Sequence, residues 1–227
     1  MNDNEQAPTG KPARLPPWNK GKMVGAKPPL RPSHVWSIRT KLQLEGRTRD
    51  LALFNLAIDS KLRGCDLVAL RVDDVARNGQ ASERAIVRQK KTGRPVQFEI
   101  TEQARQSLNA YLATVSRKPG GYLFVGRGGP DRCLTARQYA RLVSEWLVSI
   151  GLDPLVYATH SLRRTKVTLL YRRTGNLRAA QLLLGHGKIE STARYLGIEI
   201  DDALARIRSI EGVTKTETSI LLSSYKL

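Results

Sequence analysis

The chain has 227 residues, and its 38 Lys and Arg against 20 Asp and Glu give a formal net charge of +18 at pH 7. Such an excess favours a polyanionic partner, because binding releases the counterions condensed on phosphates. Ribosomal proteins and polybasic membrane-binding proteins share this composition, so charge alone indicates a nucleic acid without proving it. No apolar run approaches the roughly 18 residues that a membrane span needs, and Cys65 and Cys133 form no disulfide or metal-binding pattern. We therefore exclude a membrane-spanning protein and expect a cytoplasmic one with reduced thiols.

Residues 1–32 differ in composition from the rest of the chain. They hold seven of the 11 prolines and six Lys or Arg residues. A segment with so little apolar surface is expected to be a disordered basic arm. The arm is either a solvated tail or a cationic strand lying along DNA, and the sequence leaves both open. The folded domain is predicted to occupy residues 33–210, followed by a loosely specified tail at 211–227.

The predicted elements begin with a helix from Ser33 to about Leu44 and a second helix from about Thr48 to Leu62. A short helical turn at 67–70 and a strand at 71–75 are expected next. Two strands at 84–89 and 95–100 enclose a basic loop and predict a hairpin. Further helices are expected at 101–116, 135–150, 160–174 and 176–184, near 190–195 and near 200–209. The fold class is therefore mainly α with a small antiparallel β-sheet, an α+β domain.

Five places in the chain hold residue types suited to phosphodiester chemistry, namely Arg63, Lys91, His160 with Arg163, His186 and Tyr195. Taken alone, each has an ordinary explanation, such as a helix-end cation, a solvated loop charge, a turn histidine or a half-buried tyrosine. His160 and Arg163 are three residues apart, so on a helix they share one face and can reach the same phosphate. His186 follows Arg163 by 23 residues, and Tyr195 follows nine residues later. The joint spacing, rather than any one residue, predicts a single site.

This order of motifs resembles the signature of the tyrosine recombinases, the phage integrase family. The segments KLRGCDLVALRVDDV and LLGHGKIESTARYLG are similar to the first and last boxes of that family. The resemblance implies the tyrosine recombinase catalytic-domain fold and a site-specific recombinase that cleaves and rejoins DNA through a 3′-phosphotyrosine. Carried over position by position, it implies six catalytic residues: Arg63, Lys91, His160, Arg163, His186 and Tyr195.

The resemblance also implies a role for each of these residues. Tyr195 is the nucleophile, and His160 is the base that it requires, because a phenol has an ordinary pKa of about 10. Arg63 and Arg163 hold the non-bridging phosphate oxygens with their planar guanidinium groups. His186 donates a hydrogen bond to the pentavalent phosphorane.

The basic hairpin loop is expected to supply the proton for the leaving 5′ oxygen. Lys91 is the expected general acid, although the adjacent Lys90 fits the position nearly as well. Asp66, three residues after the first arginine, is the expected supporting residue behind the site. Contacts to DNA are predicted for Lys90, Arg94, Arg164 and Lys166. No metal or other cofactor is implied, because the covalent intermediate conserves the phosphoester energy and the acidic residues do not cluster.

The partners follow from the same resemblance. Family members act on double-stranded DNA as homotetramers that exchange C-terminal segments, so residues 211–227 are expected either to dock on a neighbouring copy or to be a disordered end. Members also carry an N-terminal helical domain that completes a clamp around DNA. The segment before residue 47 is too short for that domain, so we expect a minimal catalytic domain in the nucleoid, with an accessory DNA-binding protein as a candidate partner. A type IB topoisomerase and a non-catalytic DNA-binding protein on the same fold remain as alternatives.

Overall fold

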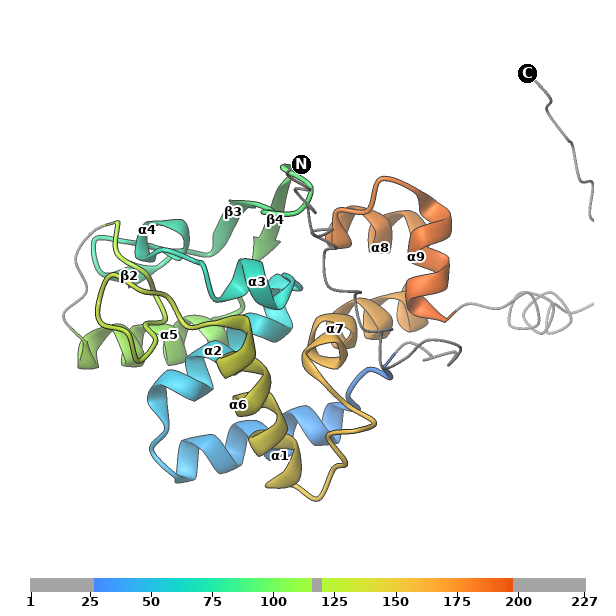
Figure 1. The fold of residues 1–227 in the computed structure, drawn as a ribbon. Helices are drawn as coiled ribbons and strands as arrows, with labels where there is room; N and C mark the ends of the chain where they lie inside the picture. The colour runs from blue at the N-terminus through green and yellow to red at the C-terminus, as the bar shows by residue number, and fades with distance from the viewer. Residues whose placement is uncertain (1–26, 116–119, 198–227) are drawn as a thin grey trace, which may run out of the picture.

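The computed structural model describes residues 27–115 and 120–197. The expected helix near 200–209, the tail at 211–227 and the arm as far as residue 26 lie outside these residues. The helices (Figure 1) are α1 Pro32–Leu44, α2 Thr48–Ser60, α3 Gly64–Leu67, α4 Val72–Val75, α5 Glu102–Thr114, α6 Ala136–Val148, α7 Thr159–Thr174, α8 Leu177–Leu184 and α9 Ile189–Leu196. The strands are β1 Ala76–Arg77, β2 Gln80–Ala81, β3 Arg84–Arg88 and β4 Pro95–Glu99. None of the helices in the described part of the chain has the length and hydropathy that crossing a membrane requires.

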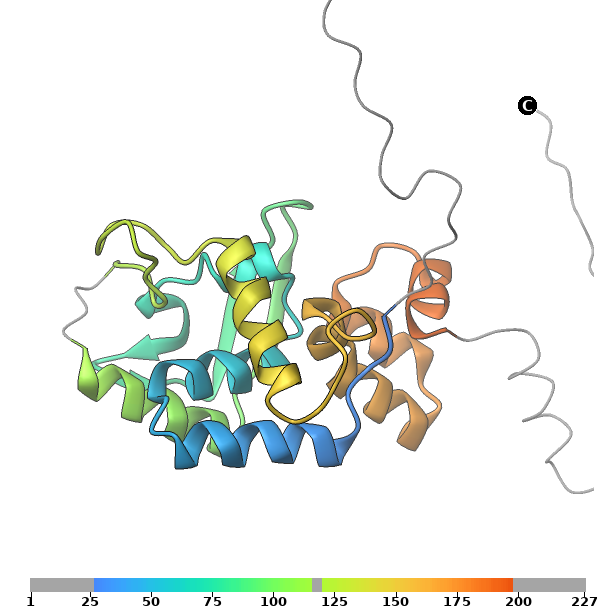
Figure 2. The same cartoon turned by 60° about the horizontal axis from the view of Figure 1, so that its bottom comes forward.

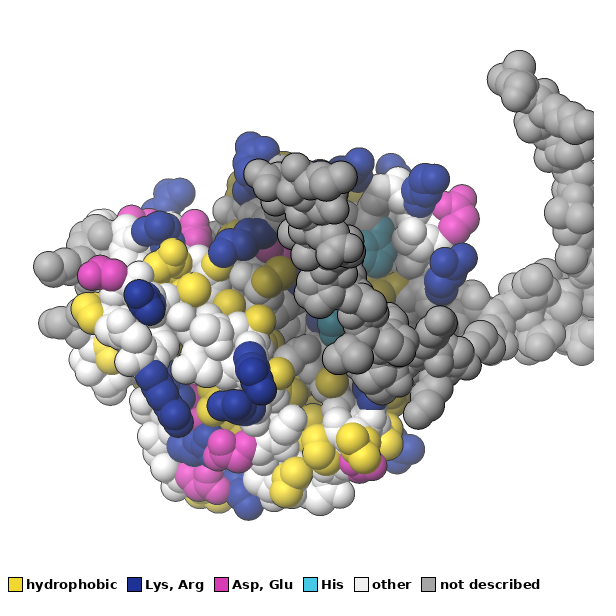
Figure 3. All heavy atoms as spheres, in the orientation of Figure 1, with side chains coloured by type: hydrophobic (Ala, Val, Ile, Leu, Met, Phe, Trp, Pro, Cys, Tyr) yellow, Lys and Arg dark blue, Asp and Glu magenta, His cyan; other side chains and the backbone are white. Residues whose placement is uncertain are grey.

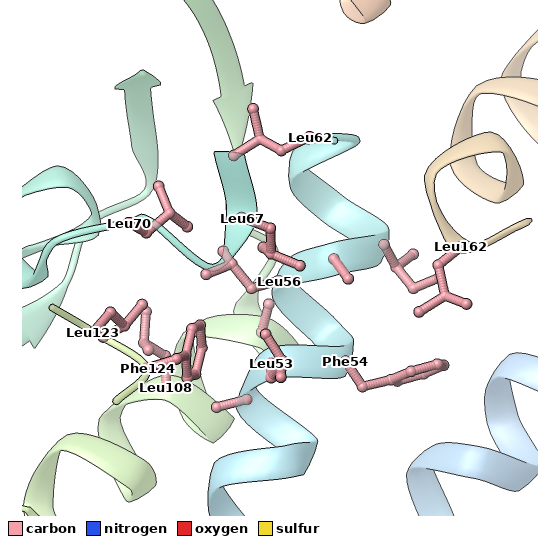
Figure 4. Close-up of a cluster of buried hydrophobic side chains, with 14 of the residues drawn as sticks. Leu53, Phe54, Leu56, Leu62, Leu67, Leu70, Leu108, Leu123, Phe124 and Leu162 are labelled. Carbon is pink, nitrogen blue, oxygen red and sulfur yellow. The ribbon is translucent and has the colours of Figure 1, made fainter. Parts of the chain in front are cut away.

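Helix α2 is the centre of the larger hydrophobic core. Ten of its 13 residues are buried, and it packs against α1, α5 and α7. Figure 4 shows Leu53 and Leu56 on the side of Leu108 and Phe124, whereas Phe54 points the other way. A helix that is apolar nearly all round has to be buried on every side. The sequence predicted this helix, and the structure shows that it is buried on nearly every side.

A buried carboxylate at the end of α2 joins three elements. Asp59 is 2 % exposed, and its Oδ1 atom lies 2.7 Å from the Nζ atom of Lys166 on α7. Its Oδ2 atom accepts hydrogen bonds from the backbone N–H and the hydroxyl of Thr101, at 2.9 and 2.7 Å. A buried charge is tolerated only when it is paired in this way. Asp59 thus holds α7 against the start of α5.

The expected hairpin is confirmed at β3 and β4, which pair antiparallel from Arg84 opposite Glu99 to Arg88 opposite Pro95. Val96, Phe98 and Ile100 are buried on one face, as their alternation predicted. The hairpin projects beyond the helical body and ends at the basic loop.

Between residues 71 and 81, the structure differs from the prediction in two places. The strand expected at 71–75 is wrong, because Val72–Val75 form the short helix α4. The Asp74 carboxylate accepts a hydrogen bond from the backbone N–H of Arg71 at 2.7 Å. This bond favours a helical turn at these residues instead of an extended strand. The sequence analysis also missed the β1–β2 hairpin, whose turn is Asn78–Gly79 with φ of 51° and 77°. Asn-Gly is a strong hairpin signal, since both turn residues adopt positive φ.

Helices α7, α8 and α9 lie together on one side of the domain (Figures 1 and 2). Val167, Ala180 and Leu184 form a second, smaller core there, against which Tyr195 packs. Helix α8 ends at Gly185, whose φ is 66°, and a Cβ atom at this position would come within 2.7 Å of Val96 on β4. Glycine therefore lets α8 approach the hairpin closely. The predicted helices 160–174, 176–184 and 190–195 are confirmed.

Candidate active site

The paired residues of the H-x-x-R motif lie at the start of α7. His160 is exposed, whereas Arg163, one turn further along, is 4 % exposed. Arg163 donates a hydrogen bond from Nη2 to the carbonyl of Leu184 at the end of α8, at 3.1 Å. Its Nε atom is buried and has no partner among the described residues. Arg163 is thus fixed by one nitrogen and keeps donors available for an anion.

Arg63 approaches the same region from the body of the domain. It is the residue before α3, and its Nη1 atom donates a hydrogen bond to Oε1 of Gln89 at 2.7 Å. Gln89 is 1 % exposed and also accepts a hydrogen bond from the hydroxyl of Thr92, at 2.8 Å. This amide therefore ties Arg63 to the base of the basic hairpin loop.

Asp66, for which a supporting role was predicted, is bonded to the backbone of the basic hairpin loop. It is 2 % exposed, and its Oδ1 atom accepts a hydrogen bond from the backbone N–H of Lys90 at 2.9 Å. The side chains of Lys90 and Lys91 are exposed, and neither ammonium group has a hydrogen-bond or ion-pair partner in the described structure. The backbone at the start of the loop is thus fixed, whereas the ammonium groups of Lys90 and Lys91 are free to move.

His186 and Tyr195 meet across the turn between α8 and α9. The two rings are edge-on, with their centroids 5.3 Å apart. The Nδ1 atom of His186 lies 3.1 Å from the hydroxyl of Thr192, which is fully buried one turn before Tyr195. If Thr192 donates this hydrogen bond, the proton of a neutral imidazole is on Nε2, where it can be donated to a ligand.

The hydroxyl of Tyr195 is buried and has no hydrogen-bond partner among the described residues. Its ring packs against two guanidinium groups, with the carbon of Arg163 5.6 Å and that of Arg164 5.0 Å from the ring centroid. Burial raises the pKa of the Tyr195 phenol, and the charges of Arg163, Arg164 and Arg63 oppose that rise. The ring of His186 contacts the Tyr195 ring edge-on. The nucleophile predicted from sequence therefore lies among cationic side chains.

The charge balance of this site favours an anion. Burial first, and then Arg163 and Arg63, lower the pKa of His186 from 6.5 to about 4. Partial burial and the same two arginines, with Arg164, also lower the pKa of His160. Within the described ranges, no carboxylate forms an ion pair with any of these arginines. Arg163 and Arg164 are buried without a carboxylate partner, which favours a negative ligand near them, and a phosphate matches the planar forks of arginines.

Two residues for which DNA contacts were predicted are engaged inside the protein. Lys166 is bound to Asp59, and Arg164 is 4 % exposed and donates a hydrogen bond to the carbonyl of Lys27 at 2.7 Å. The geometry does not support DNA contacts by these two side chains. Lys90 and Arg94 are exposed on the hairpin loop, in keeping with such a role.

The sequence analysis did not identify Gln89 and Thr192, although they position Arg63 and His186. Gln89 follows Ala85 and Val87 in the alternation of β3, so its inward orientation was available as a signal. Thr192 offered no such signal, because a threonine three residues before Tyr195 gains a role only when the α8–α9 turn closes. No group of three or more His, Cys, Asp or Glu side chains close enough to hold a metal occurs in the part of the chain described.

Comparison with known proteins gives matches over most of the chain. The family profile described as "Phage integrase family" matches residues 30–200. "Probable integrase/recombinase YoeC" from Bacillus subtilis is 30% identical over 170 residues, which cover 75% of this chain and 89% of that protein. "Tyrosine recombinase XerC" from Chromobacterium violaceum is 31% identical over 154 residues, 66% of this chain but only 48% of the relative. The chain thus spans about half the length of this XerC relative.

Solved structures give the same result for the fold. The crystal structure of "XerA recombinase" superposes with a TM-score of 0.65 at 19% identity, covering 81% of this chain and 65% of that one. A pre-cleavage complex of "XerH site-specific recombinase bound to difH substrate" gives a TM-score of 0.64 at 19% identity, with 82% of this chain and 55% of that one covered. At these identities the likeness concerns the fold alone.

Proposed function

The chain belongs to the phage integrase family, and from this premise we propose that it is a site-specific tyrosine recombinase that cleaves and rejoins double-stranded DNA through a 3′-phosphotyrosine. The observation that carries the proposal is the buried, unpartnered hydroxyl of Tyr195 beside two arginines without carboxylate partners. A tyrosine with an ordinary core role would bind its hydroxyl to a neighbour.

In the proposed reaction, the Tyr195 oxygen attacks the scissile phosphate in line and the bond from phosphorus to the 5′ oxygen breaks. Arg63 and Arg163 stabilise the negative charge that develops on the non-bridging oxygens. Neutral His186 donates from Nε2 to the same phosphorane. His160 is the proposed base for the phenol, whose pKa burial raises, and its own lowered pKa keeps it neutral and able to accept a proton.

The leaving 5′ oxygen receives its proton from Lys91 in this scheme. The lysine lies on a hairpin loop whose base is fixed through Asp66 and Gln89, while its ammonium group is free to reach a bound duplex. Rejoining is the reverse reaction, in which a 5′ hydroxyl from another strand attacks the phosphotyrosine. No energy source is required, because one phosphoester replaces another at each step.

The distribution of charge supports DNA as the substrate. Lys and Arg side chains lie over the β3–β4 hairpin and the α8–α9 region, with His side chains between them (Figure 3). Lys90 and Arg94 extend from the hairpin, and the Arg94 guanidinium lies so near Gly187 that a Cβ atom there would be 2.6 Å away. Glycine at 187 therefore lets the hairpin loop close over the turn that carries His186.

We also propose the finer arrangement that the resemblance implies. The protein would act at the nucleoid in the cytoplasm, with four copies assembled on two DNA sites. An accessory DNA-binding protein is a further candidate partner. The C-terminal tail that would dock between copies lies outside the described residues.

The test is covalent trapping on a pool of nicked duplex fragments, in which the broken strand diffuses away after cleavage. The wild-type protein should form a covalent adduct, and Tyr195→Phe should form none while its DNA affinity stays within about twofold. Tyr157→Phe is the matched control, because it removes a phenol but keeps the ring contact with His34. Binding without any adduct from the wild-type protein would instead indicate a non-catalytic DNA-binding protein. Sequencing the trapped DNA identifies the target site.

A further inference from the structure

Residues 27–31, here called the entry segment, lie along α7 next to the site. The buried residue Leu30, 2 % exposed, donates a hydrogen bond from its backbone N–H to the hydroxyl of Thr165 at 3.0 Å. The ammonium group of Lys27 donates to the carbonyl of Leu155 in the loop before α7. These residues belong to the predicted basic arm, yet they pack on the domain. The path by which the chain enters the domain is therefore fixed against the helix that carries His160 and Arg163.

Arg164 connects the entry segment to the nucleophile. Its Nη1 atom donates to the carbonyl of Lys27 at 2.7 Å, and its guanidinium carbon lies 5.0 Å from the centroid of the Tyr195 ring. A Cβ atom on Gly197, at the end of α9, would lie 3.8 Å from its Nη2 atom. The side chain thus contacts the entry segment, the Tyr195 ring and the end of α9.

The environment of Arg164 argues against an ordinary surface role. The residue is 4 % exposed, its Nε atom is buried without a partner, and no carboxylate among the described residues pairs with it. Burying an unpaired cation costs free energy, so a shorter or uncharged residue would be more stable here unless the charge is used. In this structure the charge lies over the face of the Tyr195 ring, where an arginine gains a cation–π interaction.

On the basis of the proposed function, we infer that Arg164 is a positioning residue that holds the Tyr195 ring and couples its position to the entry segment. The carbonyl of Lys27 fixes one end of the Arg164 guanidinium group. The guanidinium group in turn restrains the Tyr195 ring that it packs against. A displacement of the entry segment, for example when a protein or DNA binds the chain just before it, would move Arg164 and with it the nucleophile.

Arg164 also adds to the electrostatics of the phenol. Among the residues that the structure describes, the charged and titratable groups that face Tyr195 are Arg63, Arg163, Arg164 and His186. The charge of Arg164 lowers the pKa of the Tyr195 phenol, against the effect of burial. Removal of that charge should therefore raise this pKa, whereas a change on a distant arginine should not.

The first test measures Tyr195 without requiring activity. In protein labelled with ¹³C at the tyrosine Cζ atoms, the Tyr195 resonance is assigned by its loss in Tyr195→Phe. We expect Arg164→Gln to shift this resonance and to raise the pH at which it titrates. Leu30→Ala, which loosens the entry segment but leaves Arg164 in place, should shift it in the same direction by less. Arg173→Gln, an exposed position on the same helix, is the control and should leave it unchanged. An unchanged Tyr195 resonance in folded Arg164→Gln would overturn the inference.

The second test measures the reaction. At saturating nicked duplex, Arg164→Gln should reduce the rate of covalent attachment about tenfold and move its pH dependence to higher pH, with DNA affinity within about twofold. Arg164→Lys should keep the pH dependence near that of the wild type and still lose rate, because one ammonium group cannot bind the Lys27 carbonyl and cover the ring together. An increased rate in either variant would overturn the inference, because Arg164 would then restrain the nucleophile. If the wild-type protein forms no adduct, the proposed function fails, while the NMR result still decides the position of Tyr195.

Discussion

Arg163→Lys should retain the positive charge of the site and still lose most of the rate of covalent attachment. In the structure, Arg163 gives one N–H of Nη2 to the carbonyl of Leu184 at 3.1 Å, which leaves its other N–H groups, including Nε, for a phosphate. A lysine has one ammonium group in this buried place, and it must serve either that carbonyl or the phosphate. Losing one preorganised donor to the transition state costs about 3 kcal/mol, on the order of a hundredfold in rate.

The assay is single-turnover attachment to nicked duplex with protein in excess, so that chemistry rather than binding limits the signal. Thermal unfolding of the variant checks that the loss does not come from unfolded protein. Arg173→Lys, an exposed substitution near the end of the same helix, is the matched control and should react at the wild-type rate. A rate for Arg163→Lys within about threefold of the wild type would refute bidentate phosphate binding by Arg163.

Three further predictions address the leaving group, the core and the histidine. Lys91→Ala should be rescued by a 5′-bridging phosphorothiolate, since a thiolate leaves without a proton, and rescue of Lys90→Ala alone would move the role by one residue. Asp59→Ala should reduce the free energy of unfolding by about 1–3 kcal/mol in urea titrations, because it removes the partner of Lys166 and of the Thr101 N–H and hydroxyl groups. Between about pH 6.5 and pH 4, the stability of the wild type should fall more steeply than that of His186→Gln. The reason is that unfolded His186 binds a proton that the folded site, with a pKa of about 4, excludes.

The Asp59 prediction has a control in the same chain. Glu83→Gln breaks an exposed ion pair with Arg105 and should change the free energy of unfolding by less than about 1 kcal/mol. If Asp59→Ala reduced the free energy of unfolding by no more than Glu83→Gln does, the stabilising role of the Asp59–Lys166 pair would be contradicted. Parallel pH profiles for wild type and His186→Gln would contradict the low pKa of His186.

The order of the catalytic motifs and the long helices were accessible from the sequence, because both are local properties of the chain. The apolar run of α2, the alternation in β4 and the glycines that end α8 and α9 act within a few residues of their own positions. The spacing from His186 to Tyr195 is likewise a property of one continuous segment. Even there, short-range competition misled the prediction at 71–75, where the Asp74 carboxylate stabilises a helical turn.

Only the tertiary structure decided which cations face the site and which are used inside the protein. In the segment HSLRRTK, the spacing from His160 distinguished Arg163, but Arg164 and Lys166 appeared as equivalent positive charges on the same helix, both predicted to contact DNA. Their roles differ because other parts of the chain supply their partners: Leu184 for the first, Lys27 and Tyr195 for the second, and Asp59 for the third. These partners are between 21 and 137 residues away along the chain, so no local pattern reports them. The identity of a side chain sets what it can bind, and packing of distant segments sets what it does bind.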